Sequence, residues 1–214
     1  MRTFREVCDM TEELLYLWFG MISRMTHTVK MNVAMKYGGI RGLWNTSEEQ
    51  LRDELTQAQA DGFLEYRDAG KVVAYAEELR RNDISYIYPG HKLYPGKLYD
   101  IPDPPMLLFA AGDVDVLADL DPAVAVVGAR KASVYGREAA DRLSGELAAS
   151  GVTIVSGMAL GIDGAAHRAA MKAGGKTVAV LGSGINVPYP RENYDIYHDI
   201  RNGGGVVLSE CGLD

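Results

Sequence analysis

Residues 123–161 carry the sequence pattern that most limits the fold of this chain. Two short apolar runs, Ala123–Val127 and Val152–Val155, each end in a turn of small residues, and a segment of helical length separates them. Short apolar runs that are bounded by glycine and alternate with helices are typical of parallel strands joined by crossover helices. Ala123–Val127 is apolar at every position, which predicts a central strand covered on both faces. We therefore expect a βαβ unit here.

The same alternation continues toward the C-terminus and predicts an α/β fold with a Rossmann-like parallel sheet. The expected helices and further strands are, in chain order, helices at 134–150 and 162–173, a strand at 177–181, a helix near 192–201 and a strand at 206–208. Ser133 is a favourable N-cap for the first of these helices. Ala140, Leu143 and Leu147 recur at helical spacing in it, so we expect them to form its buried stripe.

Three successive strands of this pattern end in small-residue turns, at 128–133, 156–161 and 182–186. Because right-handed crossovers place the ends of parallel strands at one edge of the sheet, the three turns are expected to form a row of backbone N–H groups. Such an edge, beside helix N-termini, is where anions bind. Arg130 is the leading candidate for contacting the anion, because its guanidinium can bind a phosphate with two hydrogen bonds. A salt bridge to a neighbouring acid is the alternative role.

The charges of the chain support a localised anion site. Residues 128–176 contain seven Lys or Arg and four Asp or Glu, a balance of +3, whereas the whole chain carries −7 and the remainder therefore −10. Such a chain is not expected to coat a polyanion over its whole surface. The G-x-G-x-x-G and G-K-[ST] signatures are both absent from the expected turns, which disfavours NAD and ATP, so no cofactor is predicted.

Asp163 and His167 lie four residues apart and would share one helix face. An acid–base pair or two metal ligands would suit that spacing. A third ligand is missing, however, and Asp163 in the first helical turn more simply complements the helix dipole and holds His167. No metal site and no catalytic residue are therefore predicted. Tyr189 and Arg191 follow the third turn, where they could contact a sugar, base or phosphate, or simply pack at its rim.

Residues 1–82 show helical patterns without a strong strand pattern, which predicts a small all-α domain for packing or for docking a partner. Its helices are expected over 12–22, 29–37, 47–60 and 71–81. Six of the eight prolines lie between Pro89 and Pro122, so 83–122 is expected to be an extended connector with one short strand at 106–109. The expected domains are 1–82, 83–122 and 123–214.

The two cysteines, Cys8 and Cys211, lie at opposite ends of the chain, which predicts no disulfide scaffold and favours a reducing, cytoplasmic location. The longest apolar runs are too short to cross a bilayer, and residues 1–30 lack the pattern of a signal peptide. We therefore expect no membrane partner.

Four blocks, GARKASVYG, IVSGMALGIDGAAHRAAM, GKTVAVLGSGINVPYPREN and VVLSE, follow one another within residues 123–210. In order and spacing they resemble the DprA/Smf family of DNA-processing proteins. The sequence YPGKLYDIPDPPMLLFAAGDVDVL resembles the segment that precedes the Rossmann-like domain in this family. The N-terminal helices resemble the family's helical domain more loosely, because many members carry Gly-Ile-Gly where this chain has Met25-Thr26-His27-Thr28.

The resemblance implies a binding protein without a known catalytic reaction. Members of the family bind single-stranded DNA that enters the cell during natural transformation, protect it, and load the RecA recombinase onto it. The family's arginine in the first glycine turn corresponds to Arg130. The other positions that the resemblance implies to face the DNA backbone are Gly128, Ser133, Ser156, Gly157, Gly161 and Gly182. Lys172 is a further candidate for contacting the DNA.

One departure from the family follows the fourth block. Members continue there with an arginine-asparagine-arginine segment, further strands, and a surface used for homodimerisation and for RecA, whereas this sequence ends at Asp214. We therefore expect a truncated member, with a sheet that is incomplete on its C-terminal side and an exposed or substituted edge beside Ala123–Val127. Two alternatives remain. One is a Rossmann-like enzyme acting on nucleoside monophosphates, whose P-G-G-x-G-T-x-x-E signature is absent; the other is a folded remnant with little DNA binding.

Overall fold

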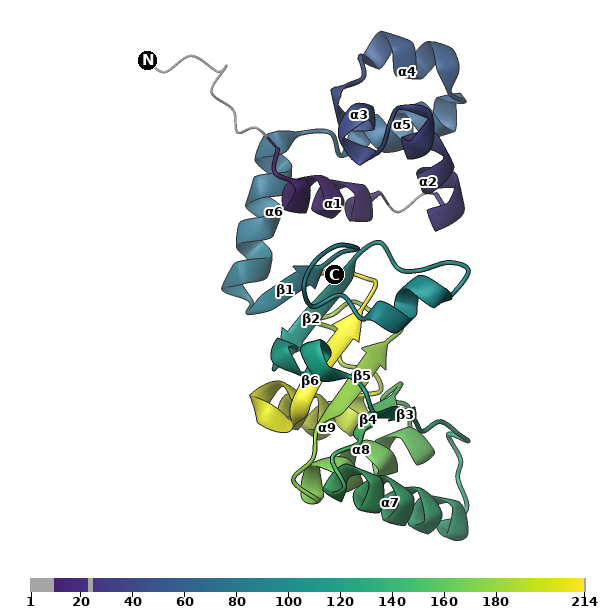
Figure 1. Ribbon diagram of the computed structural model, residues 1–214, viewed down its shortest axis with the longest axis vertical. Helices are drawn as coiled ribbons and strands as arrows, with labels where there is room; N and C mark the ends of the chain where they lie inside the picture. The colour runs from purple at the N-terminus through teal and green to yellow at the C-terminus, as the bar shows by residue number, and fades with distance from the viewer. Residues whose placement is uncertain (1–9, 23–24, 214) are drawn as a thin grey trace. The chain divides into compact units, whose positions relative to one another are not determined.

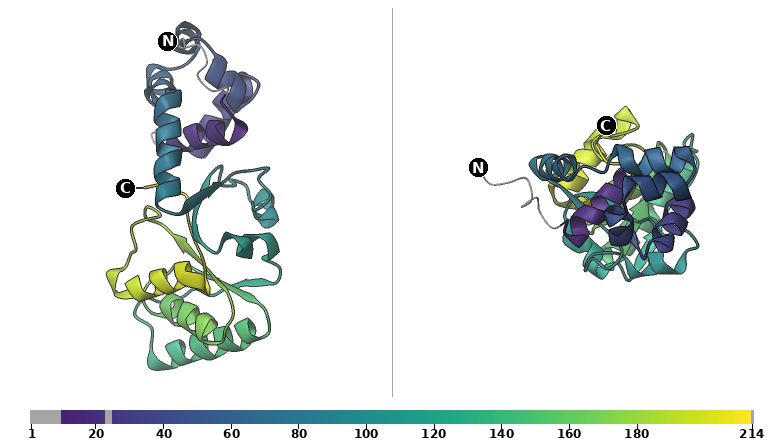
Figure 2. Two further views of the ribbon diagram at one scale, coloured as in Figure 1. Left: turned by 90° about the vertical axis from the view of Figure 1, so that its left-hand side faces the viewer. Right: turned by 90° about the horizontal axis from the view of Figure 1, so that it is seen from above.

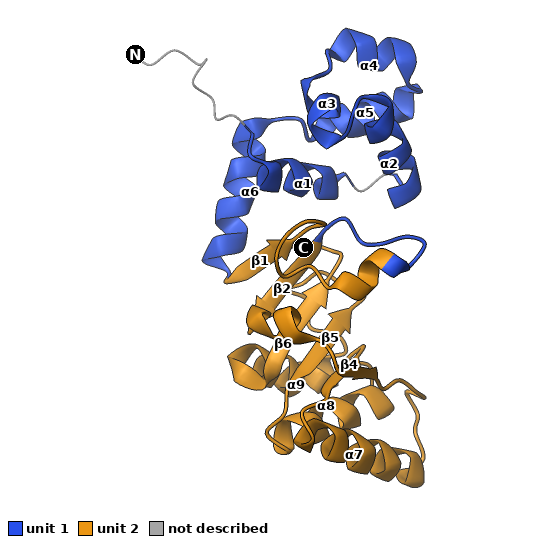
Figure 3. Ribbon diagram, viewed as in Figure 1, with its two compact units in different colours: residues 1–82, 100–107 blue, residues 83–99, 108–214 orange. Residues whose placement is uncertain are grey.

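The computed structural model describes residues 10–22 and 25–213 (Figure 1). The chain forms two compact units (Figure 3). One contains the helices up to Asn82 together with Asp100–Leu107, and the other contains Asp83–Tyr99 together with the chain from Leu108 onward. The functional division into 1–82, 83–122 and 123–214 stays a prediction. Cys8 lies outside the described residues, and Cys211 is free and exposed.

The described part of the first unit is helical, as the sequence predicted. Its helices are α1 (Glu12–Met21), α2 (His27–Lys36), α3 (Ile40–Asn45), α4 (Glu48–Glu54), α5 (Gln57–Glu65) and α6 (Ala69–Arg81). Trp18, Phe19 and Phe63 are fully buried and form its aromatic core. The single helix expected over 47–60 is two helices, because Thr56 and Gln59 form a capping box that starts α5.

The second unit is built on a six-stranded sheet, which confirms the predicted α/β class. The strands are β1 (Ile84–Ile87), β2 (Leu108–Gly112), β3 (Ala123–Ala125), β4 (Thr153–Ser156), β5 (Thr177–Leu181) and β6 (Gly205–Ser209). Their order is β1-β2-β6-β5-β4-β3. The strands from β6 to β3 pair in parallel, and β2 pairs antiparallel with both β1 and β6.

The proline-rich segment contributes two strands to this sheet where the sequence suggested one. β1 was missed because its four residues, ISYI, are too short for a clear period. The strand expected at 106–109 begins and ends later, at Leu108–Gly112. The prolines therefore flank paired strands rather than preventing them.

Helices cover the sheet on both faces. The helical segments of this unit are η1 (Gly96–Asp100), η2 (Val114–Asp119), α7 (Val134–Ala149), α8 (Ile162–Lys172), η3 (Arg191–Asn193), α9 (Tyr194–Asp199) and η4 (Ile200–Gly204). Ile154 packs against α7 and α8 on one face, whereas Val178 and Val206 pack with Leu117 of η2 on the other. Figure 2 shows α9 and the η1–η2 segment on opposite sides of the strands.

The buried stripe of α7 differs from the prediction. Ala140, Ser144 and Ala148 are buried, whereas Leu143 is exposed. Leu147, the third predicted position, is partly buried against the cluster that contains Ile154. Ala148 packs tightly against the turn that follows α8, because a Cβ added at Gly175 would approach the Ala148 Cβ to 2.7 Å.

β3 is an edge strand rather than the central strand that its composition suggested. Among the described residues it pairs with β4 alone. Val124 is 39% exposed and Val127 is 73% exposed, so this run is not covered on both faces. The expected exposed edge beside Ala123–Val127 is thereby confirmed.

Hydrogen exchange provides a direct test of this edge. Outward-pointing amides of β3 have no strand partner, so we expect them to exchange faster than the amides of β5, which is paired on both sides. Exchange followed by mass spectrometry or NMR at low protein concentration is the measurement. Full protection of β3 in a protein shown to be monomeric would contradict the prediction.

Candidate functional site

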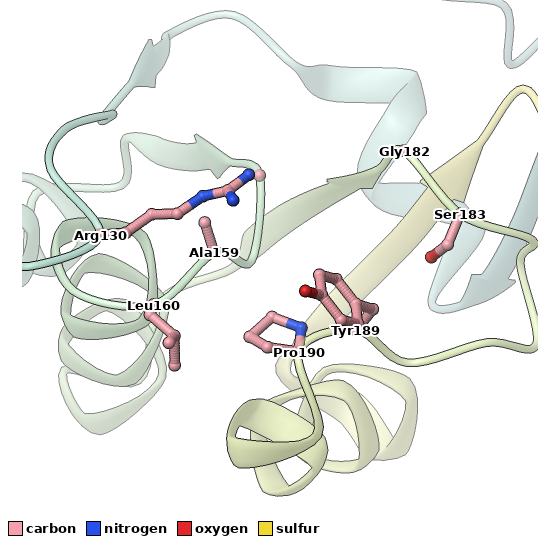
Figure 4. Close-up of a pocket in the computed structure, with 8 residues that line it drawn as sticks. Arg130, Ala159, Leu160, Gly182, Ser183, Tyr189 and Pro190 are labelled. Atoms are coloured by element: carbon pink, nitrogen blue, oxygen red, sulfur yellow. The ribbon is translucent and has the colours of Figure 1, made fainter.

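The three small-residue turns lie at one edge of the sheet of the second unit, as the sequence predicted, and they line one pocket there. They follow β3, β4 and β5, whose carboxyl ends lie at one edge of the sheet. The pocket has a volume of about 310 Å³, and its lining residues are Arg130, Gly157, Ala159, Leu160, Gly182, Ser183, Tyr189 and Pro190. Figure 4 shows Arg130 on one side of it and Ser183 on the other.

Arg130 provides the positive charge of this pocket. Its side chain extends from the first turn over Ala159 (Figure 4). The residue is exposed, and it forms neither a hydrogen bond nor an ion pair with any residue that the structure describes. The alternative role of a structural salt bridge is therefore not realised within residues 10–22 and 25–213. An unengaged guanidinium at the mouth of a pocket is available to an anion.

Two residues of the first turn, Ser133 and Gly128, fix its backbone rather than lining the pocket. The Ser133 hydroxyl accepts a hydrogen bond from the Gly136 N–H at 3.0 Å, which caps α7 as predicted. Gly128 packs against the start of α8, because an added Cβ would approach Ile162 Cγ1 to 2.7 Å. Both residues thus fix the backbone that carries Arg130.

Ser156 and Gly161 bring the second turn against the first. The Ser156 hydroxyl is buried and donates to the Val126 carbonyl oxygen at 2.6 Å, so it faces the sheet rather than the pocket. Gly161 has a φ of 81°, and a Cβ there would overlap the carbonyl oxygens of Ala129 and Arg130. Only glycine meets both requirements at that position.

Two buried polar side chains hold the second turn from inside. Oδ2 of Asp163 accepts the N–H groups of Gly157 at 3.1 Å and of Ala159 at 3.3 Å. The Asn193 amide donates to the carbonyl oxygens of Met158 at 2.9 Å and of Ala159 at 3.0 Å. Asp163 and Asn193 are 5% and 3% exposed. Four hydrogen bonds from buried side chains therefore fix this turn, and two of them occupy its backbone N–H groups.

The structure does not bring Lys172 to the pocket. Lys172 ends α8, an 11-residue helix that starts beside the second turn. At 1.5 Å per residue the helix carries Lys172 about 15 Å away, toward the opposite edge of the sheet. Gly182, by contrast, lines the pocket, and a Cβ placed there would meet nothing within 4 Å.

His167 is a buried structural residue and is not bonded to Asp163. Its Nδ1 lies 2.7 Å from the Thr177 hydroxyl oxygen, and that hydroxyl donates to the Ile154 carbonyl oxygen at 2.7 Å. Nδ1 must therefore carry the proton that Thr177 accepts. Burial lowers the pKa of His167 from 6.5 to about 4, so the ring is neutral at pH 7.

Within the described residues, no group of three potential metal ligands occurs.

The comparisons with known proteins identify the family. The sequence model of DNA recombination-mediator protein A matches residues 85–214. The chain belongs to this family. That membership confirms the resemblance drawn from the four sequence blocks.

Several relatives within the DNA recombination-mediator protein A family are known. The chain is 45% identical to DNA processing protein DprA of Streptococcus pneumoniae over 119 residues, which cover 56% of this chain and 41% of that protein. It is 37% identical to DNA processing protein DprA of Bacillus subtilis over 147 residues, covering 68% and 48%. The chain thus spans less than half the length of these two relatives.

Two solved structures of the family are also similar. The crystal structure of DNA processing protein A from Streptococcus pneumoniae superposes with a TM-score of 0.69 at 30% identity, covering 92% of this chain and 66% of that one. A structure of DNA processing protein A from Helicobacter pylori, which was studied for its single-stranded DNA binding mode, superposes with a TM-score of 0.54 at 30% identity, covering 61% of this chain and 57% of that one.

Sequence reasoning missed part of the pocket wall. Ala159, Leu160, Ser183 and Pro190 line it, although the sequence did not single them out. Each lies within or just beyond a predicted turn, so the turn positions themselves were the available signal. Tyr189, for which the sequence left open a ligand contact or packing at the rim, lines the pocket and is 65% exposed.

In the described part of the chain, no helix is both long and apolar enough to span a membrane.

Proposed function

We propose that this protein binds single-stranded DNA at the pocket formed by the three turns. The observation that carries the proposal is the exposed Arg130 guanidinium, which has no partner among the described residues and stands at the edge where three parallel strands end. A phosphate of the DNA backbone is the anion that best suits this group. Similarity to the DNA processing proteins of Streptococcus pneumoniae and Helicobacter pylori, the latter with a described single-stranded DNA binding mode, supports DNA as the source of this phosphate.

The pocket favours a single strand over a duplex. Its volume of about 310 Å³ accommodates one nucleotide-sized group and not a double helix. Tyr189 exposes much of its aromatic ring at the pocket wall, and an unpaired base can stack on such a ring. A base inside a duplex is already stacked and paired, and would have to be extruded first.

The remaining parts of the proposed function rest on the family. We propose that the bound DNA is protected and transferred to RecA recombinase and that the protein acts in the cytoplasm. Homodimerisation, which the family implies, uses a surface that follows the fourth sequence block in its members. No catalytic step is proposed. The polar side chains of the pocket include no described acid–base pair or metal-ligand group.

A titration of the whole chain tests the proposal. Fluorescently labelled oligo-dT is expected to bind more tightly than a duplex of equal length, with an affinity that falls as salt is added. Fluorescence anisotropy measures both. Absent binding would leave the folded-remnant alternative, and equal affinity for the duplex would contradict recognition of a single strand. Release of adenine from AMP would instead favour the alternative of a Rossmann-like enzyme that acts on nucleoside monophosphates, and we expect none.

A further inference from the structure

The second turn of the pocket already holds an anion. The Asp163 carboxylate accepts the N–H groups of Gly157 and Ala159 through a single oxygen, at 3.1 and 3.3 Å. Converging backbone N–H groups at the start of a helix, just beyond a parallel strand, form the kind of nest that binds phosphate in many α/β proteins. Here the chain fills that nest with its own side chain.

The fit between the nest and the carboxylate is close. A Cβ added at Gly157 would stand 3.0 Å from Oδ2 of Asp163, so the glycine makes room for the carboxylate. Asn193 holds the second turn in place against the Asp163 carboxylate, because its amide donates to two carbonyl oxygens of that turn. Arg168 extends this support: it contacts the Asn193 amide oxygen at 3.4 Å and forms an ion pair with Asp195 at 2.9 Å.

The other walls of the pocket are open to a ligand. The Arg130 guanidinium has no described partner, and the space beside Gly182 is empty to 4 Å. A ligand phosphate is therefore attracted by Arg130 on the side of the first turn and repelled by the fixed negative charge behind the second turn. This repulsion is about twice as strong for a phosphate monoester, which carries close to two negative charges, as for a diester, which carries one.

We propose that Asp163 is a specificity-determining residue: it closes the second turn to phosphate, so that the pocket accepts the phosphodiesters of a strand interior and rejects phosphate monoesters. The rejected ligands would include free nucleotides, inorganic phosphate and 5′-phosphorylated strand ends. The inference rests on the proposed DNA binding and adds which part of the strand is bound. Asp163 acts through the turn and need not contact the DNA.

Chemical rescue by phosphate tests the proposal. Asp163→Ala empties the nest, so inorganic phosphate at roughly ten times its Kd should raise the melting temperature of this variant by about 3 °C. The unmodified protein and Asp141→Asn, which removes an exposed carboxylate of α7, should show no shift beyond that given by chloride at equal ionic strength. An equal shift in all three proteins, or none in a folded Asp163→Ala, would overturn the proposal.

A competition assay keeps the test decisive if Asp163→Ala does not fold. Asp163→Asn retains an oxygen for the two N–H groups and loses the charge, so dTMP should displace labelled oligo-dT from it at about fivefold lower concentration than from the unmodified protein. An unchanged competition profile, or strong competition by dTMP in the unmodified protein, would overturn the proposal. Failure of the unmodified protein to bind oligo-dT at all would instead contradict the proposed function.

Discussion

Arg130→Ala is expected to weaken the binding of oligo-dT by roughly tenfold to a hundredfold, because a charge-assisted, two-pronged hydrogen bond to phosphate is lost. The slope of log affinity against log salt should also decrease by about 0.7, the value for one phosphate contact on a single strand. Anisotropy titrations across a salt series measure both quantities. The thermal stability should stay unchanged, because Arg130 is exposed and has no described partner.

Arg142→Ala is the matched control for this experiment. It removes the same charge from an exposed position of α7, away from the lining of the pocket. A general electrostatic attraction would make the two variants equally weak, and that result would remove Arg130 from the site. Arg130→Lys separates charge from geometry, because lysine retains the charge but cannot form the two-pronged contact. Its affinity should lie between those of the alanine variant and the unmodified protein.

The place of Arg130 was predictable because it depends on chain chirality and strand direction. Right-handed crossovers between parallel strands leave one outcome for the three turns, whatever their detailed geometry. The sequence therefore indicated that Arg130, Gly157 and Gly182 would lie at one edge of the sheet, and in the structure they line one pocket there. The helical caps were predictable for a similar reason: Ser133 acts on a backbone N–H three residues away, so the interaction is local.

The directions in which the turn residues point were not predictable. Ser156 faces the Val126 carbonyl oxygen, and the Gly157 N–H faces Asp163. Both interactions depend on where distant backbone lies, and a serine or glycine in a turn has the same pattern whether it faces solvent or core. Asn193 shows the same limit, because its partners Met158 and Ala159 lie 35 and 34 residues away in the chain.

Short elements and edge positions were also beyond the sequence pattern. β1 and α3 are four and six residues long, too short for a period to be distinguished from chance. The all-apolar run Ala123–Val127 predicted a central strand, yet β3 lies at an edge with Val127 exposed. An apolar composition indicates that both faces of a strand can be buried. Whether they are buried depends on which strands and helices lie beside that strand in the fold.

His167 should make the protein sensitive to mild acid. Its pKa is about 4 in the folded protein, chiefly because burial disfavours the charged ring, and 6.5 is the value for an exposed histidine. Between these values the unfolded chain takes up a proton that the folded protein does not. The neutral His167 ring therefore contributes about 3 kcal/mol to the free energy of unfolding. This contribution is present in full above pH 6.5 and is lost as the pH falls to about 4.

The acid sensitivity follows from the hydrogen bonds of this one ring. Nδ1 is committed to Thr177, and Nε2 has no partner within the described residues, so a second proton would be buried without an acceptor. His167→Asn retains a donor toward Thr177 but cannot titrate. The free energy of unfolding, measured with urea, should decrease between pH 7 and pH 4 by about 3 kcal/mol less for this variant than for the unmodified protein. His198→Asn, at an exposed histidine, should keep the full acid loss. If His167→Asn kept it as well, carboxylate protonation rather than this imidazole would govern the acid response.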